Sequence, residues 1–130
     1  MPTRPRIALR SVLALVLAIA AVPLVNLAGG ELSDALGLPP GGTLRLSVDL
    51  FWVFMAGVAG SALMVGVAAV AKAAHAWAIF ALYLALDVHV TVAAWDDFPR
   101  GFTLACLLTL PLQVWLGWWW AAKRGTRNEE

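Results

Sequence analysis

The chain has 130 residues, of which 62% are hydrophobic and only 13% are charged, and its formal net charge at pH 7 is +1. Soluble domains contain roughly half apolar residues, so this composition, with a mean hydropathy of +0.82, excludes a soluble domain and indicates an integral membrane protein. We expect the lipid bilayer, and not nucleic acid, as its partner. The single cysteine, Cys106, rules out an intrachain disulfide and a cysteine metal cluster.

Four apolar stretches approach the ~20 residues that are needed to cross a hydrocarbon core. They predict an all-α, four-transmembrane-helix bundle that forms one domain over residues 1–130, with spans near 7–28, 47–71, 73–95 and 101–122. The first span follows a basic leader, and small residues at Ala18 and Ala20 would also suit a cleavable signal peptide. Because the apolar run continues past Pro23, we favour an uncleaved span; cleavage would leave three spans.

The connections between these spans are short. Residues 29–46 are rich in glycine and proline, and we expect them at the membrane interface, with Ser33 starting one short turn. The second span turns into the third at Lys72, so these two spans form an antiparallel hairpin. After Trp95, the DDFPR break with Pro99 ends the third helix, and one fourth helix then runs from about Gly101 to Ala122.

The cations predict the orientation. One side holds Arg4, Arg6, Arg10, Lys72, Lys123, Arg124 and Arg127, and the other holds only Arg45 and Arg100. We therefore expect both the N- and the C-terminus in the cytoplasm. The tryptophans agree with this orientation, because such rings prefer the headgroup level. Trp52 and Trp95 fall near outer helix ends, and Trp77, Trp115, Trp118, Trp119 and Trp120 fall near inner ones.

Small residues predict how the helices pack, since close backbone approach drives much of helix association in lipid. The second span offers Ala56, Gly57, Gly60 and Ser61, and the third carries a stripe formed by Ala74, Ala78, Ala81 and Ala85. We expect the second and third spans to be the tightest pair.

Asp87 is the most unusual residue, because it falls near the middle of the third span. A carboxylate there costs about 2.5–3.5 kcal/mol on insertion scales, which implies a partner, protonation or a purpose. Tyr83, Asp87 and Thr91 share one helix face, opposite the alanine stripe. The candidate polar site comprises Asp87, His89, Asp49, Tyr83, Gln113 and Thr109. Arg45 and Arg100 are alternative partners for Asp87, and Asp49 can instead cap the second span.

The fourth span gathers polar and small residues on one side, which we expect to face inward: Thr103, Cys106, Thr109, Gln113 and Gly117. Cys106 is expected to pack as a small apolar residue. We find no catalytic constellation and expect no enzyme activity, no metal and no cofactor.

Three functions remain open. The first is a structural, assembly or accessory-subunit role, alone as a homo-oligomer or in a larger membrane complex. The second is a homo-oligomeric, proton-coupled small-molecule carrier centred on Asp87. The third is haem binding by His75 and His89, whose 14-residue separation resembles that of paired axial histidines in di-haem b-type cytochromes.

Two resemblances bear on these functions. In length and span count the chain looks like the small multidrug resistance transporters, but their first span carries a membrane-embedded glutamate. Here Asn26 is the only strongly polar side chain between Ser11 and Gly29.

The segments FWVFMAGVAGSALMVGVAAVAKAAHAWAIFALYLAL and DDFPRGFTLACLLTLPLQVWLGWWW lie in about the last two-thirds of the chain. They are similar to small four-span bacterial inner-membrane proteins of unknown function, whose second span is glycine-rich and whose last span has a Leu-Pro pair and a late glycine. The matching positions here are Gly57, Gly60, Leu110, Pro111 and Gly117. The resemblance implies a bacterial inner-membrane location and no activity.

Overall fold

The structure, a computed structural model, describes residues 3–127. Within that range the chain forms five α-helices and no β-strand: α1 (Arg4–Ala35), α2 (Thr43–Val67), α3 (Lys72–Ala93), α4 (Arg100–Leu108) and α5 (Leu110–Arg127). α4 and α5 follow each other closely and together make the fourth of four segments that are long and apolar enough to cross a membrane. The predicted all-α, four-helix architecture is confirmed.

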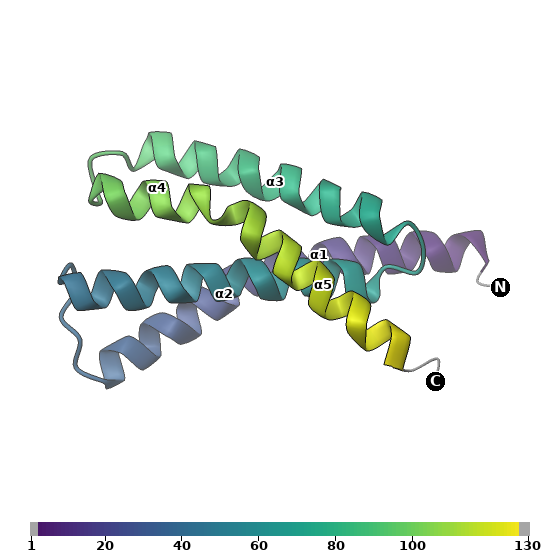
Figure 1. The fold of residues 1–130 in the computed structure, drawn as a ribbon, viewed down its shortest axis with the longest axis horizontal. Helices are drawn as coiled ribbons and strands as arrows, with labels where there is room; N and C mark the ends of the chain where they lie inside the picture. Colours follow the sequence, from purple (N-terminus) through teal and green to yellow (C-terminus); the bar gives the residue numbers. More distant parts are fainter. Residues whose placement is uncertain (1–2, 128–130) are drawn as a thin grey trace.

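Successive segments run in opposite directions, so the start of α1 and the end of α5 lie at the same end of the bundle (Figure 1). This end also collects the cations of the first turns of α1, the start of α3 and the last turns of α5. We call it the basic end. The cations that the sequence segregates are therefore segregated in space, as the orientation argument requires.

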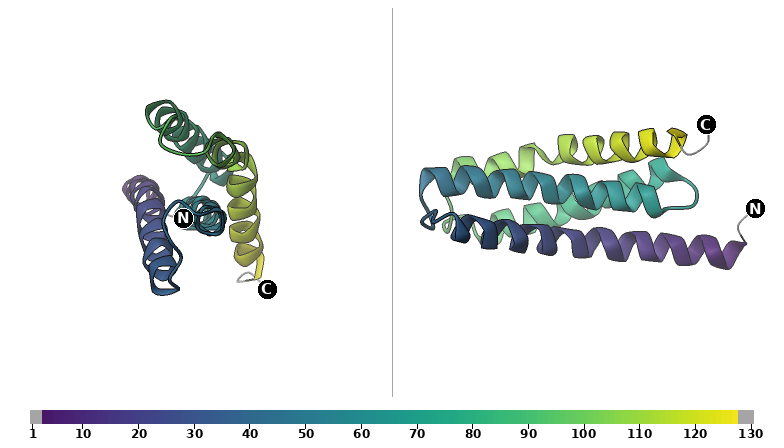
Figure 2. Two further views of the ribbon diagram at one scale, coloured as in Figure 1. Left: turned by 90° about the vertical axis from the view of Figure 1, so that its left-hand side faces the viewer. Right: turned by 90° about the horizontal axis from the view of Figure 1, so that it is seen from below.

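α2 is the central helix of the bundle (Figure 2). Its contacts are mainly with α1 and α5 and much less with α3. All four of its predicted packing residues, Ala56, Gly57, Gly60 and Ser61, are buried. The expectation that the second and third spans form the tightest pair is wrong. Gly57 and Ser61 meet Gln113 of α5. Gly60 lies against the Ala18 backbone of α1 as well as the Tyr83 side chain of α3, so at these positions α3 approaches α2 closely at one side chain only.

The alanine stripe on α3 is not buried against a neighbouring helix within residues 3–127. Ala74, Ala78, Ala81 and Ala85 are all exposed, whereas the buried residues of α3 are Ile79 and Tyr83. The cause is the anchoring of Tyr83, which lies on the opposite side of the helix from the alanines. Once that side is fixed inward, the stripe must face outward.

α1 is longer than expected because it continues through the glycines of the first connection. Gly29 is buried against the ring of Trp52 on α2, and a Cβ at this position would overlap that ring. The Ser33 hydroxyl donates a hydrogen bond to the Gly29 carbonyl at 2.9 Å. These contacts keep residues 29–35 helical, so the separate interfacial turn expected at Ser33 does not form.

The N-terminal part of α1 is also built into the bundle. The Arg10 Nε donates a hydrogen bond to the Val67 carbonyl at 2.9 Å, where α2 ends and its carbonyls lack intrahelical partners. Cleavage near Ala20 would remove this contact and the N-terminal part of the α1 surface that packs on α2.

The fourth span is broken, where we expected one continuous helix. Pro111 has no N–H, so the Leu107 carbonyl loses the donor that a continuous helix would supply. The Thr109 hydroxyl donates to the Ala105 carbonyl at 2.7 Å beside the break. As a result α4 runs beside α3, and α5 turns away to cross α2 (Figure 1).

Candidate intramembrane polar site

A cavity of about 270 Å³ lies where all four spans meet. Its polar side chains come from three of them: Asn26 from α1, Tyr83 and Asp87 from α3, and Gln113 from α5. The rest of its lining is apolar and comprises Ile19, Val22, Pro23, Val53, Gly57, Leu86 and Leu110. This volume is close to the lower end of the range for small-molecule sites, about 300–1,000 Å³.

Tyr83 of α3 lies where α1, α2 and α3 approach one another closely. Its hydroxyl donates a hydrogen bond to the Ala18 carbonyl of α1 at 2.6 Å. The phenol passes directly over Gly60 of α2, where a Cβ would collide with the hydroxyl oxygen. The missing side chain of Gly60 therefore allows α3 to be fastened to α1 across α2.

Gln113 occupies an equivalent gap at Gly57, about one turn away from Gly60 on α2. Its side chain is 2% exposed, and a Cβ at Gly57 would collide with its Oε1 atom. Its Nε2 donates to the Thr109 hydroxyl at 3.0 Å, and that hydroxyl donates in turn to the Ala105 carbonyl. Gln113 and Thr109 thus form a small hydrogen-bonded chain beside the break in the fourth span.

Asp87 is half-buried and is one of the residues that line the cavity. The salt bridges found within residues 3–127 both belong to Arg45, so neither pairs with Asp87. Arg100 lies over the Trp95 ring, with its guanidinium carbon 5.4 Å from the ring centroid. The two arginines considered as partners are therefore engaged elsewhere, and the polar residues that line the cavity together with Asp87 are neutral.

Proline shapes the α1 wall of the cavity. Pro23 lines it and has no N–H, so the carbonyl of Ile19, another lining residue, lacks its usual helical donor. Asn26 lies one turn further on and donates to the Val22 carbonyl at 3.0 Å. We did not assign Asn26 to the site from the sequence. The available signal was a lone amide three residues after a proline in an apolar span.

Asp49 does not reach the cavity. It accepts a hydrogen bond from Arg45 Nε at 3.1 Å near the opposite end of the bundle from the basic end. Arg45 also donates to Asp34 at 2.6 Å and to the Leu38 carbonyl at 3.1 Å. Since the N-cap of α2 is Gly42, Asp49 does not cap the helix; it helps to tie α2 to the connection that follows α1.

The two histidines also lie away from the cavity. His89 is exposed on the outward side of α3. His75 has both ring nitrogens within hydrogen-bond distance of partners, Nδ1 at 3.0 Å from the Ala71 carbonyl and Nε2 at 3.0 Å from the Ser11 hydroxyl. To ligate haem, His75 would have to give up one of these contacts.

The polar face of the fourth span is turned inward. Thr103, Gln113 and Gly117 are buried, and Cys106 and Thr109 are half-buried. No group of three or more His, Cys, Asp or Glu residues within the described range is placed to hold a metal ion. The structure therefore joins Tyr83, Asp87, Gln113 and, through Gln113, Thr109 into one site, and it separates Asp49 and His89 from them.

No protein-family model, curated protein or solved structure matches the chain. The resemblance to small four-span inner-membrane proteins stays a prediction, and function has to be inferred from the geometry of the bundle.

Proposed function

We propose that the protein is an accessory or assembly subunit of the bacterial inner membrane, with both termini in the cytoplasm, and that α3 presents its outward face to a transmembrane helix of a partner subunit. The observation that carries the proposal is the composition of this uncovered face. It combines the exposed alanine stripe with the exposed imidazole of His89.

Both parts of this face suit contact with protein better than contact with lipid. Ala81, Ala85 and His89 follow one another at intervals of four residues and so share one line along the helix. Small side chains let a second helix approach closely. Ionisable side chains within transmembrane segments almost always face protein or a water-filled cavity. His89 is four residues, or about 6 Å, inside the end of α3 at Ala93, so a polar group on a partner helix would be its natural contact.

Affinity purification of the tagged protein from its native membrane in a mild detergent, followed by mass spectrometry, tests this proposal. Site-directed cross-linking locates the contact: with Cys106→Ser as background, Ala85→Cys should cross-link to the co-purified subunit. Val16→Cys, on an exposed face of α1, is the matched control and should not. Recovery of the chain as a monomer, with no cross-link from either position, would exclude the accessory role.

A second candidate function, the homo-oligomeric proton-coupled carrier, is favoured by the cavity. Asp87 would be the titrating group, and Tyr83, Asn26 and Gln113 would supply neutral hydrogen-bonding groups around a small solute. The prolines of the first and fourth spans leave helical carbonyls without donors, a feature that transporters tolerate where backbone lines a cavity.

Asp87→Asn separates the two candidates. If the variant is folded and inserted at normal level but loses the cellular role, the carrier is supported; loss of assembly or of protein level supports the accessory subunit. Proton uptake into proteoliposomes under an imposed membrane potential gives a direct reading. Asp49→Asn, which removes a carboxyl group outside the cavity, is the control.

A further inference from the structure

We propose that an anionic phospholipid binds between α3 and α5 at the basic end, with an acyl chain in the aromatic groove between the two helices and its phosphate beside Lys72. This inference uses a different side of α3 from the face proposed for a partner subunit, and it does not depend on that role.

The groove follows from the break in the fourth span. α4 accompanies α3, but beyond Pro111 the chain turns toward α2 (Figure 1). There Gly117 is buried so closely against α2 that a Cβ would collide with the Ser61 hydroxyl and would lie 2.5 Å from the Val58 carbonyl oxygen. With α5 held in this way, α3 and α5 diverge and leave an opening of about 240 Å³.

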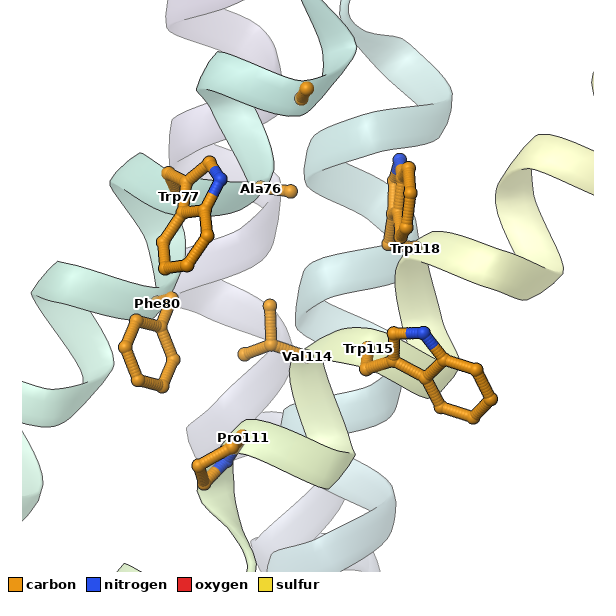
Figure 3. A pocket seen from close by; sticks show the side chains of 8 residues that line it. Ala76, Trp77, Phe80, Pro111, Val114, Trp115 and Trp118 are labelled. Atoms are coloured by element: carbon orange, nitrogen blue, oxygen red, sulfur yellow. The ribbon is translucent and has the colours of Figure 1, made fainter.

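The walls of the opening are apolar and largely aromatic. Figure 3 shows Trp77 and Trp118 on opposite sides, with Ala76 and Val114 between them. Trp77 is 70% exposed and Trp118 is 38% exposed, so the chain itself does not fill the space. Tryptophan rings prefer the boundary between headgroups and acyl chains, which is the depth at which the upper part of a lipid tail would lie.

The length of the groove favours a lipid tail over a partner helix. Its α3 wall runs from Ala73 to Phe80, which corresponds to about 10 Å along the helix axis. A transmembrane partner would need a face of about 30 Å. A flexible hydrocarbon chain can enter a short groove and leave it again at the lipid boundary.

The charge at the open end of the groove matches an anionic headgroup. Lys72 directly precedes the groove on α3, and its ammonium nitrogen lies 3.7 Å from the place where a Cβ on Gly125 of α5 would be. The cation therefore sits between the two helices. The first turn of α3 holds no acidic residue. Basic sites between transmembrane helices on the cytoplasmic side are suited to acidic lipid headgroups, and the predicted orientation places Lys72 on that side.

Native mass spectrometry of the full-length protein tests the proposal, with phosphatidylglycerol and phosphatidylcholine that carry identical oleoyl chains. The wild type should retain one phosphatidylglycerol in preference to phosphatidylcholine. Lys72→Gln should lower this preference about five-fold, the effect of one basic residue near a membrane surface. Arg6→Gln removes an equal charge from the basic end of α1, away from the groove, and should leave the preference unchanged.

Filling the groove gives the second arm of the test. Ala76→Leu should abolish retention of phosphatidylglycerol, and Ala78→Leu, on the exposed stripe, should not. If Ala76→Leu fails to fold, Ala73→Leu at the exposed rim replaces it. Unchanged retention in the folded groove variant would overturn the proposal, and so would equal retention of the two lipids by the wild type. A dimer that dissociates on filling the groove would assign the space to a second copy of the chain.

Discussion

Adding one methyl group at Gly60 should lower the stability of the bundle by displacing a single side chain, Tyr83. In Gly60→Ala the new Cβ would collide with the Tyr83 hydroxyl, lie 2.9 Å from the ring carbon that bears it and lie 3.1 Å from the Ala18 carbonyl oxygen. Tyr83 would have to withdraw, and its hydrogen bond to Ala18 would break. α3 would then lose its buried link to α1.

The expected loss of unfolding free energy in Gly60→Ala is the sum of two costs and one gain. Overpacking a tight contact costs about 1–3 kcal/mol. An interhelical hydrogen bond in a membrane protein contributes about 0.6 kcal/mol on average and about 1.7 kcal/mol at most. Alanine is favoured over glycine within a helix by about 1 kcal/mol. The free energy of unfolding should therefore fall by about 2 kcal/mol.

Unfolding in mixed micelles with increasing dodecyl sulfate, followed by circular dichroism, measures this change. Gly66→Ala is the matched control, since it lies in the same helix and a Cβ there meets nothing within 4 Å. It should be neutral or gain up to about 1 kcal/mol from helix propensity. Tyr83→Phe should lower the penalty of Gly60→Ala, because the colliding hydroxyl is gone. Equal stability of Gly60→Ala and Gly66→Ala, or an unchanged penalty in the Tyr83→Phe background, would refute the reasoning.

Three further changes test other parts of the fold. Pro111→Ala restores the missing N–H and should straighten the fourth span. Double electron–electron resonance between spin labels on α3 and at the end of α5 should then give a shorter distance. An unchanged distance would show that packing on α2 alone sets the bend. Asp87→Asn should be at least as stable as the wild type in the same micelles, because it removes a charge and breaks neither recorded salt bridge; a clear loss of stability would reveal a structural partner for the carboxylate. Arg45→Gln should speed proteolysis of the glycine-rich connection between α1 and α2 in low salt, and high salt should raise the cleavage rate of the wild type toward that of the variant. A cleavage rate that changes neither with the substitution nor with salt would mean that the two ion pairs do not hold the connection.

The sequence predicts a good part of this structure. Apolar length sets the number of spans, and helical periodicity places Tyr83 and Asp87 on one face and the alanine stripe on the other. It does not decide which face points inward, because small residues can accommodate a neighbour from the same chain or from a partner. That choice depends on a long-range contact, the hydrogen bond from Tyr83 to Ala18 across Gly60.

The candidate site, too, is predicted in part by the sequence and decided in part by tertiary packing. Polar residues in apolar spans identify Asp87 and Gln113 from the sequence. Which spans bring their polar groups together depends on the bends at Pro23 and Pro111, and the direction in which a proline-broken helix continues is set by tertiary packing. For this reason the cavity includes Asn26, whereas Asp49, equally polar, is drawn to Arg45 at the end of the bundle.

The uneven attachment of α3 has a consequence for motion. α1, α2 and α5 share most of the helix contacts, while α3 buries only Ile79 and Tyr83. Proteins open locally where the fewest apolar contacts resist, so α3 should separate from the bundle before the other helices separate from one another. Such an opening would expose Asp87 to its surroundings and leave a membrane-embedded carboxyl group unsheltered. A partner helix bound to the outer face of α3 would suppress this opening. The lifetime of the unbound protein in the membrane would then depend on how soon such a helix binds.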